Sequence, residues 1–257
     1  MKQSTAKKPV EKHQESAQET AKTETTSRPT RQHRTYLFQF MLIVTTGAFA
    51  FLTFLVKTIP SFPIDLAITR AIQSIHFPFS DEFMQLVSWP GFSPQSYILS
   101  AVVGLIIYAL GLRWEAVSAL VAALFPPLIN VLVKELIRRP RPTMDLVHVF
   151  RILDSYSFPS GHVMFYVGFF GFLWFLAYTL LKRSWKRTVL LIMYGVPILF
   201  VGVSRIYLGQ HWPSDVLGAY LLGSLTLVVI IRFYRWGRKR FFVHQPVAPH
   251  DATPTEQ

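Results

Sequence analysis

Six long apolar stretches constrain the fold of this 257-residue chain more than any other feature of its sequence. A helix of roughly 17–25 apolar residues crosses the hydrocarbon core of a bilayer. The predicted spans are Tyr36–Val56, Ser96–Leu112, Ala116–Val133, His162–Leu181, Thr188–Val203 and Asp215–Phe233. The sequence therefore predicts an all-α fold, a polytopic bundle of six transmembrane helices.

Three segments follow from this pattern. Residues 1–34 are polar, with almost no large apolar side chain, so we expect them to form a disordered N-terminal tail. Residues 35–240 form the predicted six-helix membrane domain. Residues 241–257 are mostly polar and contain proline, which predicts a flexible C-terminal tail.

Composition excludes several classes of function. The chain has no cysteine, which rules out thiol catalysis, disulfide bonds and zinc–thiolate sites. The formal net charge of +12 would suit a nucleic-acid partner, but the basic residues cluster beside the apolar stretches. Such clusters are typical of the cytoplasmic ends of membrane spans. We therefore expect membrane lipids as partners, and no nucleic acid.

The basic flanks also predict the orientation of the bundle. The N-terminal tail, the loop 182–187 and the run 235–240 are rich in lysine and arginine, and with six spans they share one side. The positive-inside rule makes that side, with both termini, the cytoplasmic side of the cell membrane. The loops that then face outward are 57–95, 134–161 and 204–214. One outward loop breaks the rule, which indicates that its charges serve an anionic ligand. Those charges are Lys134, Arg138, Arg139 and Arg141.

The outward loop 57–95 carries a helical pattern of its own. Isoleucines recur on one face, at Ile64, Ile68, Ile72 and Ile75. Arg70 and Gln73 lie off that face. The pattern predicts an amphipathic helix that lies at the membrane interface, or else a helix outside the membrane that packs on the bundle.

The most specific polar pattern follows the fifth span. His211 and Asp215 are four residues apart, and Pro213 suits the first turn of the next helix. Asp215 can then accept a hydrogen bond from one ring nitrogen of His211 and leave the other nitrogen free for nucleophilic attack. Arg205 can bind two phosphate oxygens at once. Taken alone, the pair could equally be an interfacial histidine and an aspartate that stabilises a helix N-terminus.

A second pattern marks the start of the fourth span. Ser160 and Gly161 precede a long apolar run, so their N–H groups and the serine hydroxyl point out of a helix N-terminus, which binds anions readily. His162 then lies at the mouth of the site, where it can protonate a leaving oxygen. Taken alone, Ser160 is more simply an N-cap.

The third pattern lies at the end of the third span. Lys134 and Arg141 are seven residues apart, close to two helical turns, so one face carries both. Pro140 and Pro142 stiffen the backbone around Arg141. Taken alone, this is a basic helix end whose side chains reach out of the membrane. All three patterns fall on one predicted membrane face, which favours a single phosphate-binding site.

Together these residues resemble a known signature. The stretches Lys134-x6-Arg141-Pro142, Pro159-Ser160-Gly161-His162 and Ser204-Arg205-x5-His211-x3-Asp215 are similar, in the same order, to the three-part motif of the type 2 phosphatidic acid phosphatase (PAP2) superfamily. The motif spans residues 134–215, and the six-span layout extends the resemblance over roughly 36–236.

The resemblance implies a role for each residue. His211 would be the nucleophile that forms a phosphohistidine, supported by Asp215, and His162 would be the general acid. The implied phosphate-binding residues are Lys134, Arg141, Ser160, Gly161 and Arg205. The resemblance implies no metal and no other cofactor. Arg138 and Arg139 have no place in the motif, and we expect them to contact a second phosphate or the lipid headgroup.

The resemblance also implies an integral-membrane phosphatase that acts on lipid phosphates or diphosphates at the outer membrane face. Phosphatidic acid, phosphatidylglycerophosphate and undecaprenyl diphosphate are the candidate substrates. Soluble vanadium haloperoxidases share the motif, but the six spans argue against that branch. Two alternatives stay open: a lipid phosphotransferase that uses the same phosphohistidine, and a non-catalytic phospholipid binding or transport protein. Neither the lipid nor the oligomeric state follows from the sequence.

Overall fold

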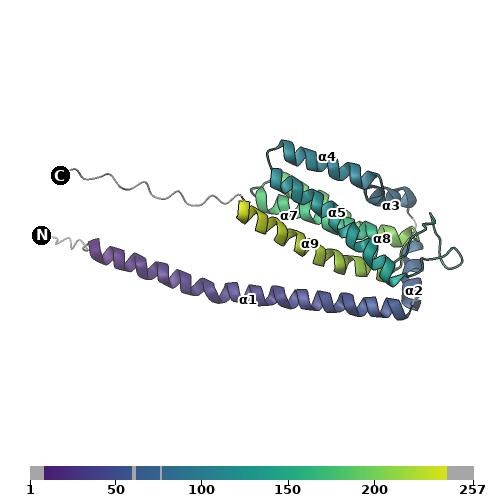
Figure 1. Ribbon diagram of the computed structural model, residues 1–257, viewed down its shortest axis with the longest axis horizontal. Coiled ribbons are helices and arrows are strands. Elements are labelled where there is room, and N and C mark those ends of the chain that lie inside the picture. Colours follow the sequence, from purple (N-terminus) through teal and green to yellow (C-terminus); the bar gives the residue numbers. More distant parts are fainter. Residues whose placement is uncertain (1–8, 60–61, 76, 242–257) are drawn as a thin grey trace. The chain divides into compact units, whose positions relative to one another are not determined.

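The computed structural model describes residues 9–59, 62–75 and 77–241, and these residues are mostly helical and contain no strand. The α-helices are α1 (Pro9–Thr58), α2 (Pro63–Gln73), α3 (Ser80–Ser88), α4 (Gln95–Ala109), α5 (Arg113–Ile137), α6 (Gly161–Phe165), α7 (Gly171–Leu180), α8 (Trp185–Tyr207) and α9 (Pro213–Phe241). A short 3-10 helix, Trp89–Gly91, joins α3 to α4, and a π-helical turn, Tyr166–Phe170, joins α6 to α7. Helices α5, α7, α8 and α9 pack side by side (Figure 1).

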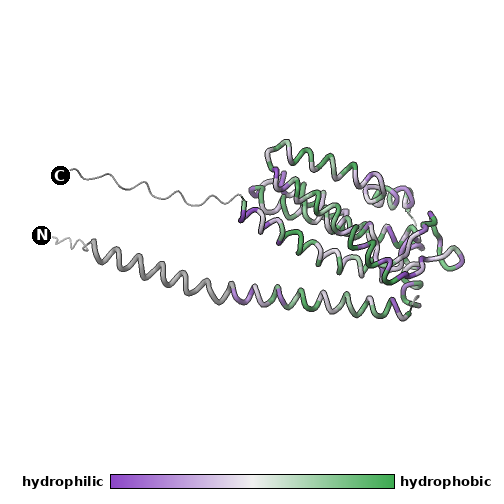
Figure 2. Tube along the Cα trace, viewed as in Figure 1, coloured by the Kyte–Doolittle hydropathy of each residue, from purple (hydrophilic) through white to green (hydrophobic). Residues whose placement is uncertain are grey.

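Five segments of the described chain are long and apolar enough to cross a membrane. They are Gln32–Thr58, Arg113–Ile137, Gly161–Leu180, Trp185–Tyr207 and Pro213–Phe241. The sixth predicted span coincides with α4, which is bent by 60° from the preceding helical segment Ser80–Gly91. Figure 2 shows apolar residues along these helices and hydrophilic residues where α2 meets the loop after α5. The prediction of an all-α, multi-span membrane protein is confirmed.

The first helix begins earlier than the sequence analysis predicted. Residues 9–34 are helical, where we expected a disordered tail. Glutamate, lysine, glutamine and alanine are frequent in this stretch and favour helix, and an existing helix is extended more easily than a new one is nucleated. Residues 1–8 and 242–257 lie outside the described part of the chain, so the C-terminal tail stays a prediction. The chain divides into two units after Gly47, and the candidate site lies in the second.

Helix α2 confirms that the outward loop 57–95 contains a helix, although Ile75 lies beyond its end. The face turned to the bundle carries two buried polar residues, since Asp65 and Thr69 are only 2% and 0% exposed, together with Ile72, which packs against the core. By contrast, Ile64 is 66% exposed. The helix therefore packs through these polar side chains and Ile72, and leaves Ile64 and Ile68 exposed, as a helix at a membrane interface does.

The core of the bundle depends on close approach between helices. Gly168, in the π-helical turn, lies so close to α5 that a Cβ atom there would be 2.4 Å from Cγ of Pro126 and 3.0 Å from the carbonyl oxygen of Ala122. Gly218 in α9 likewise faces the ring of Phe158, and a Cβ atom at Gly218 would be 2.4 Å from Cε2 of that ring. Small residues at such contacts are typical of helix packing in membranes, where backbones must come close together.

We therefore expect Gly168→Val to destabilise the bundle by about 1–3 kcal/mol, because the new side chain must displace a rigid proline ring and a backbone carbonyl. Thermal unfolding of the purified protein in detergent measures the effect. Gly47→Val is the matched control, since a Cβ atom at Gly47 meets nothing within 4 Å. Equal melting temperatures for the two variants would contradict this packing.

Candidate active site

The structure brings the three sequence patterns together at one end of the bundle. Lys134 lies near the end of α5, Arg205 near the end of α8, and Asp215 in the first turn of α9. The backbone N–H of Ser160 donates to the carbonyl oxygen of Asp215 at 3.2 Å, which joins the second pattern to the third. Nη1 of Arg141 lies 3.4 Å from Nε2 of His211, which joins the first to the third.

His211 is buried in a positively charged environment and is only 2% exposed. Burial, followed by the charges of Arg141, Lys134 and Arg205, holds its pKa well below the ordinary histidine value. The ring is therefore neutral near pH 7. A neutral imidazole keeps a lone pair on one nitrogen, which a nucleophile requires.

The predicted hydrogen bond between Asp215 and His211 is not formed in this structure. Their nearest atoms, Oδ2 and Nδ1, are 3.6 Å apart, which is longer than a hydrogen bond. Both carboxylate oxygens are engaged elsewhere. Oδ1 accepts from Nη1 of Arg139 at 2.5 Å, and Oδ2 accepts from the Trp212 N–H at 2.8 Å and from the Ser157 hydroxyl. Asp215 thus fixes the backbone that follows His211, at Trp212, and joins it to Arg139 and Ser157.

Arg139 is the centre of a buried ion network that the sequence analysis missed. Its side chain is fully buried and also donates to Oδ2 of Asp65 at 2.8 Å and to Oγ of Ser214 at 2.7 Å. Asp65 in turn accepts from the N–H of Ser214 at 2.9 Å and from its hydroxyl at 2.5 Å. The network therefore ties α2 to the start of α9.

This burial corrects the prediction for Arg139, which cannot contact a second phosphate or a headgroup, while the same prediction for Arg138 stays a prediction. Arg139 is occupied by two carboxylates inside the protein. Arg138 is exposed, lies 3.8 Å from Glu135, and takes a left-handed backbone conformation (φ 55°) at the end of α5. Because of that turn, the side chain of Arg138 is exposed and the side chain of Arg139 is buried. One residue in the sequence could have indicated this network. Asp65 is an acidic residue within the apolar pattern of the predicted interfacial helix, and such a residue usually has a buried partner.

The turn that carries Ser160 is held by Asn130 on α5. Nδ2 of Asn130 donates to the carbonyl oxygen of Pro159 at 2.9 Å. Its Oδ1 lies so near Gly161 that a Cβ atom there would be only 3.1 Å away. Glycine therefore suits this position because the helix N-terminus approaches α5 closely. Asn130 was not among the predicted site residues.

His162 and Arg205 share one aromatic neighbour, Phe92, which follows the 3-10 helix. The rings of Phe92 and His162 meet edge to face with centroids 4.5 Å apart, and the guanidinium carbon of Arg205 lies 5.2 Å from the Phe92 centroid. Gly91 packs against His162 with no room for a side chain. Nη1 of Arg205 donates to Oγ of Ser88 at 3.2 Å. These contacts hold both predicted site residues in fixed orientations.

Several buried polar atoms at the site have no hydrogen-bond partner within the described chain. They are Oγ of Ser160, Nε2 of His162, Nδ1 of His211, and Nε and Nη2 of Arg205. A buried donor without a partner costs about 1–3 kcal/mol, so most buried polar groups in proteins are satisfied. Arginine and hydroxyl donors near a neutral histidine fit an oxyanion such as phosphate.

Lys134 and Arg141 also connect the loop before α6 to the site. Nζ of Lys134 donates to the carbonyl oxygen of Tyr156. Arg141 donates to the carbonyl oxygen of Ser155 at 2.6 Å and to that of Gln210 at 2.5 Å. Burial lowers the pKa of Arg141, and the charge of Asp215 opposes that shift. Arg141 thus fixes two loops beside the nucleophile candidate, in addition to supplying a positive charge.

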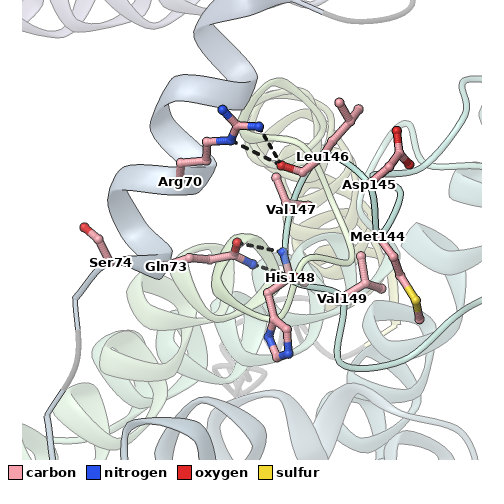
Figure 3. Close-up of a pocket in the computed structure, with 9 residues that line it drawn as sticks. All are labelled: Arg70, Gln73, Ser74, Met144, Asp145, Leu146, Val147, His148 and Val149. Carbon is pink, nitrogen blue, oxygen red and sulfur yellow. Dashed lines mark hydrogen bonds between the residues drawn. The ribbon is translucent and has the colours of Figure 1, made fainter.

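Helix α2 forms hydrogen bonds with another part of the loop between α5 and α6, at residues 146–148, as Figure 3 shows. Nε2 of Gln73 donates to the carbonyl oxygen of His148 at 2.7 Å, and the His148 N–H returns a bond to Oε1 at 3.1 Å. Nε and Nη2 of Arg70 both donate to the carbonyl oxygen of Leu146, at 3.2 and 3.0 Å. These residues border an open cavity of about 650 Å³. Arg70 and Gln73, the two polar residues that the sequence analysis placed off the isoleucine face, therefore hold the loop between α5 and α6 in place.

Comparison with known proteins places the chain in a family. A model of the PAP2 superfamily matches residues 115–239, which contain all three patterns. The chain is 33% identical over 174 residues to phosphatidylglycerophosphatase B of Bacillus subtilis (strain 168), an alignment that covers 66% of this chain and 82% of that protein. It is 40% identical over 70 residues to an undecaprenyl-diphosphatase of Sulfolobus acidocaldarius, which covers 27% of this chain and 30% of that protein. The crystal structure of a transmembrane PAP2-type phosphatidylglycerolphosphate phosphatase from Bacillus subtilis matches with a TM-score of 0.67 at 27% identity, over 79% of this chain and 98% of the other.

The Arg139 network predicts a large effect of one substitution on stability. Arg139→Leu leaves Asp65 and Asp215 buried without their shared cation, and we expect it to cost about 3–5 kcal/mol. Thermal unfolding in detergent measures the loss. Adding Asp65→Asn to this variant removes one of the unpaired charges and is expected to restore part of the lost stability.

Arg138→Leu is the control, since this neighbouring arginine is exposed. It is expected to change stability by no more than about 0.5 kcal/mol. If Arg138→Leu and Arg139→Leu lowered the melting temperature equally, the buried network would not have the importance that the structure gives it.

Proposed function

The chain belongs to the PAP2 superfamily, and from that premise we propose that it hydrolyses lipid phosphates or diphosphates through a phosphohistidine intermediate at the outer face of the cell membrane. It is a multi-pass membrane protein of the lipid phosphatase type. The observation that carries the proposal is the neutral, buried His211 with Arg141 beside it and unpartnered donors of Ser160, His162 and Arg205 at the same end of the bundle.

In the first step, the substrate phosphate is held by Arg205, Lys134 and the turn at Ser160–Gly161. Nε2 of His211 attacks phosphorus, so a P–N bond forms as the P–O bond to the lipid breaks. His162 gives a proton to the departing lipid oxygen. Fixed positive charges stabilise the spread charge of the transition state, which is the main contribution that a protein makes to phosphoryl transfer.

In the second step, water attacks the phosphohistidine and His162 takes a proton from that water. The P–N bond breaks, inorganic phosphate leaves, and His211 is neutral again. Asp215 acts in both steps by fixing the backbone around His211, because its carboxylate already accepts from Arg139, Ser157 and Trp212. Arg141 is engaged by backbone carbonyls, so its part is mainly its charge beside Nε2.

The names of similar proteins support a choice of substrates for the test. Phosphatidylglycerophosphatase and undecaprenyl-diphosphatase are names of relatives, and phosphatidic acid is a lipid with one phosphate for comparison. We expect the purified protein to release inorganic phosphate from at least one of the three lipids in the presence of a chelator. His211→Ala is expected to abolish release, because the nitrogen that forms the P–N bond is then removed.

His148→Ala is the matched control, because His148 is an exposed histidine of the neighbouring loop. It is expected to keep the activity of the parent protein. Activity of His211→Ala near that of the parent would overturn the mechanism. Phosphate that appeared only on an added alcohol, and not in water, would favour the phosphotransferase. No turnover of any of the three lipids, with binding retained, would favour the binding protein.

The outer-face location rests on the direction of the helices. α8 runs from the basic loop 182–187 to Arg205, and α9 runs from Asp215 to the basic run 235–240. The candidate site therefore lies at the end of the bundle opposite these basic segments, which the positive-inside rule places in the cytoplasm.

Cysteine labelling tests this orientation against a clean background, because the native chain has no cysteine. We expect Asp154→Cys to react with a membrane-impermeant thiol reagent added to intact cells, and Ser184→Cys to react only after permeabilisation. Both positions are exposed, whereas the nearby Ser157 is fully buried and unsuitable. Reversed labelling would place the site in the cytoplasm and remove outer-leaflet lipids as substrates.

A further inference from the structure

Arg151 is a cation beside the candidate site that the three sequence patterns do not include. It is exposed, in the loop between α5 and α6, and its guanidinium carbon lies 5.8 Å from the centroid of the Phe92 ring. The same ring contacts His162 and Arg205, with the guanidinium carbon of Arg205 at 5.2 Å. Arg151 is thus one aromatic ring away from both.

A cavity of about 290 Å³ lies between Arg151 and Arg141, the arginine beside the nucleophile candidate. Arg141 and Gln210 line the cavity together with Arg151, and Nη1 of Arg141 is 3.4 Å from Nε2 of His211. Gln210 is only 3% exposed, and its Oε1 has no hydrogen-bond partner within the described chain. The cavity therefore joins Arg151 to Arg141 and to Gln210, which precedes His211 in the chain.

The lining of this cavity favours an anion. Arg141 and Arg151 are its charged residues, and no aspartate or glutamate is among the lining residues that the structure describes. Most of the remaining wall is apolar, with Ile152 and Leu153 on the side of Arg151. Arg141 is largely occupied by backbone carbonyls, whereas Arg151 is exposed and binds a ring face. A guanidinium of this kind can form strong, charge-assisted hydrogen bonds with phosphate oxygens.

We propose that Arg151 and this cavity form a subsite for a second phosphate of the substrate, next to the phosphate that reacts at His211. This inference rests on the proposed function. The second phosphate is attached directly to the first in a lipid diphosphate, and is the phosphodiester of phosphatidylglycerophosphate. Phosphatidic acid has none. Arg151 thereby selects lipids with two phosphates, the part that the sequence analysis assigned to Arg138 and Arg139.

The test compares the parent protein with Arg151→Gln on phosphatidic acid, phosphatidylglycerophosphate and undecaprenyl diphosphate. We expect kcat/KM to fall about 10- to 100-fold on lipids with two phosphates, as the loss of a hydrogen bond to a charged group implies. The fall on phosphatidic acid is expected to stay below about threefold, since that lipid does not reach Arg151. Arg151→Lys, which keeps the charge, is expected to restore part of the loss.

Arg138→Gln is the matched control, an exposed arginine of the same loop, and is expected to leave all three substrates unaffected. If kcat/KM of Arg151→Gln falls on the diphosphate alone, or on phosphatidylglycerophosphate alone, the result supports the subsite and identifies the second phosphate that it binds. An equal fall on all three lipids, or no fall on any, overturns it.

A binding measurement separates failure of the subsite from failure of the proposed function. We expect inorganic diphosphate to raise the melting temperature of the parent more than inorganic phosphate does, and Arg151→Gln to lose this difference. A parent without turnover on any lipid would defeat the proposed function, while the diphosphate shift would still decide the subsite. No preference for diphosphate in the parent overturns the subsite even if the protein is an active phosphatase.

Discussion

The ion network of Arg139 holds the candidate site together. One guanidinium bridges Asp65 on the interfacial helix α2 and Asp215 at the start of α9, with no exposed surface on the arginine side chain. Burying such charges is costly unless every group is paired and hydrogen-bonded. Here Ser214, Ser157 and the Trp212 N–H complete the set. The position of α9, and with it the loop that carries His211, depends on this network.

The network also explains why the site is positively charged although Asp215 is part of it. The carboxylate of Asp215 is paired with Arg139, so its one charge does not balance those of Lys134, Arg141 and Arg205 as well. Those three cations, after burial, keep the pKa of His211 low. A substrate phosphate would supply the missing negative charge. Arg139 thus stabilises the fold, whereas Arg141 and Arg205 attract an anion.

Local sequence patterns were sufficient for part of this result. Hydropathy predicted the membrane-spanning helices, and the number and order of those spans predicted that residues from three segments, such as Lys134, His162 and His211, meet at one end. Contacts between distant segments could not be predicted. Arg138 and Arg139 are adjacent and chemically identical, yet a left-handed residue at the end of α5 exposes one and buries the other against Asp65. Phe92 likewise acquires its place only through the packing of α8 against the helices that precede α4.

The central claim is that a covalent phosphoenzyme forms on His211, and mapping that intermediate tests it most directly. The protein would be mixed with lipid substrate, quenched in alkali within milliseconds, digested, and analysed by mass spectrometry. The account predicts an acid-labile phosphate on the peptide that contains His211, formed and lost fast enough to support turnover. Phosphate on another residue, or full turnover with no phosphoenzyme and inversion at a chiral phosphorus, would contradict it, because water would then attack the substrate directly.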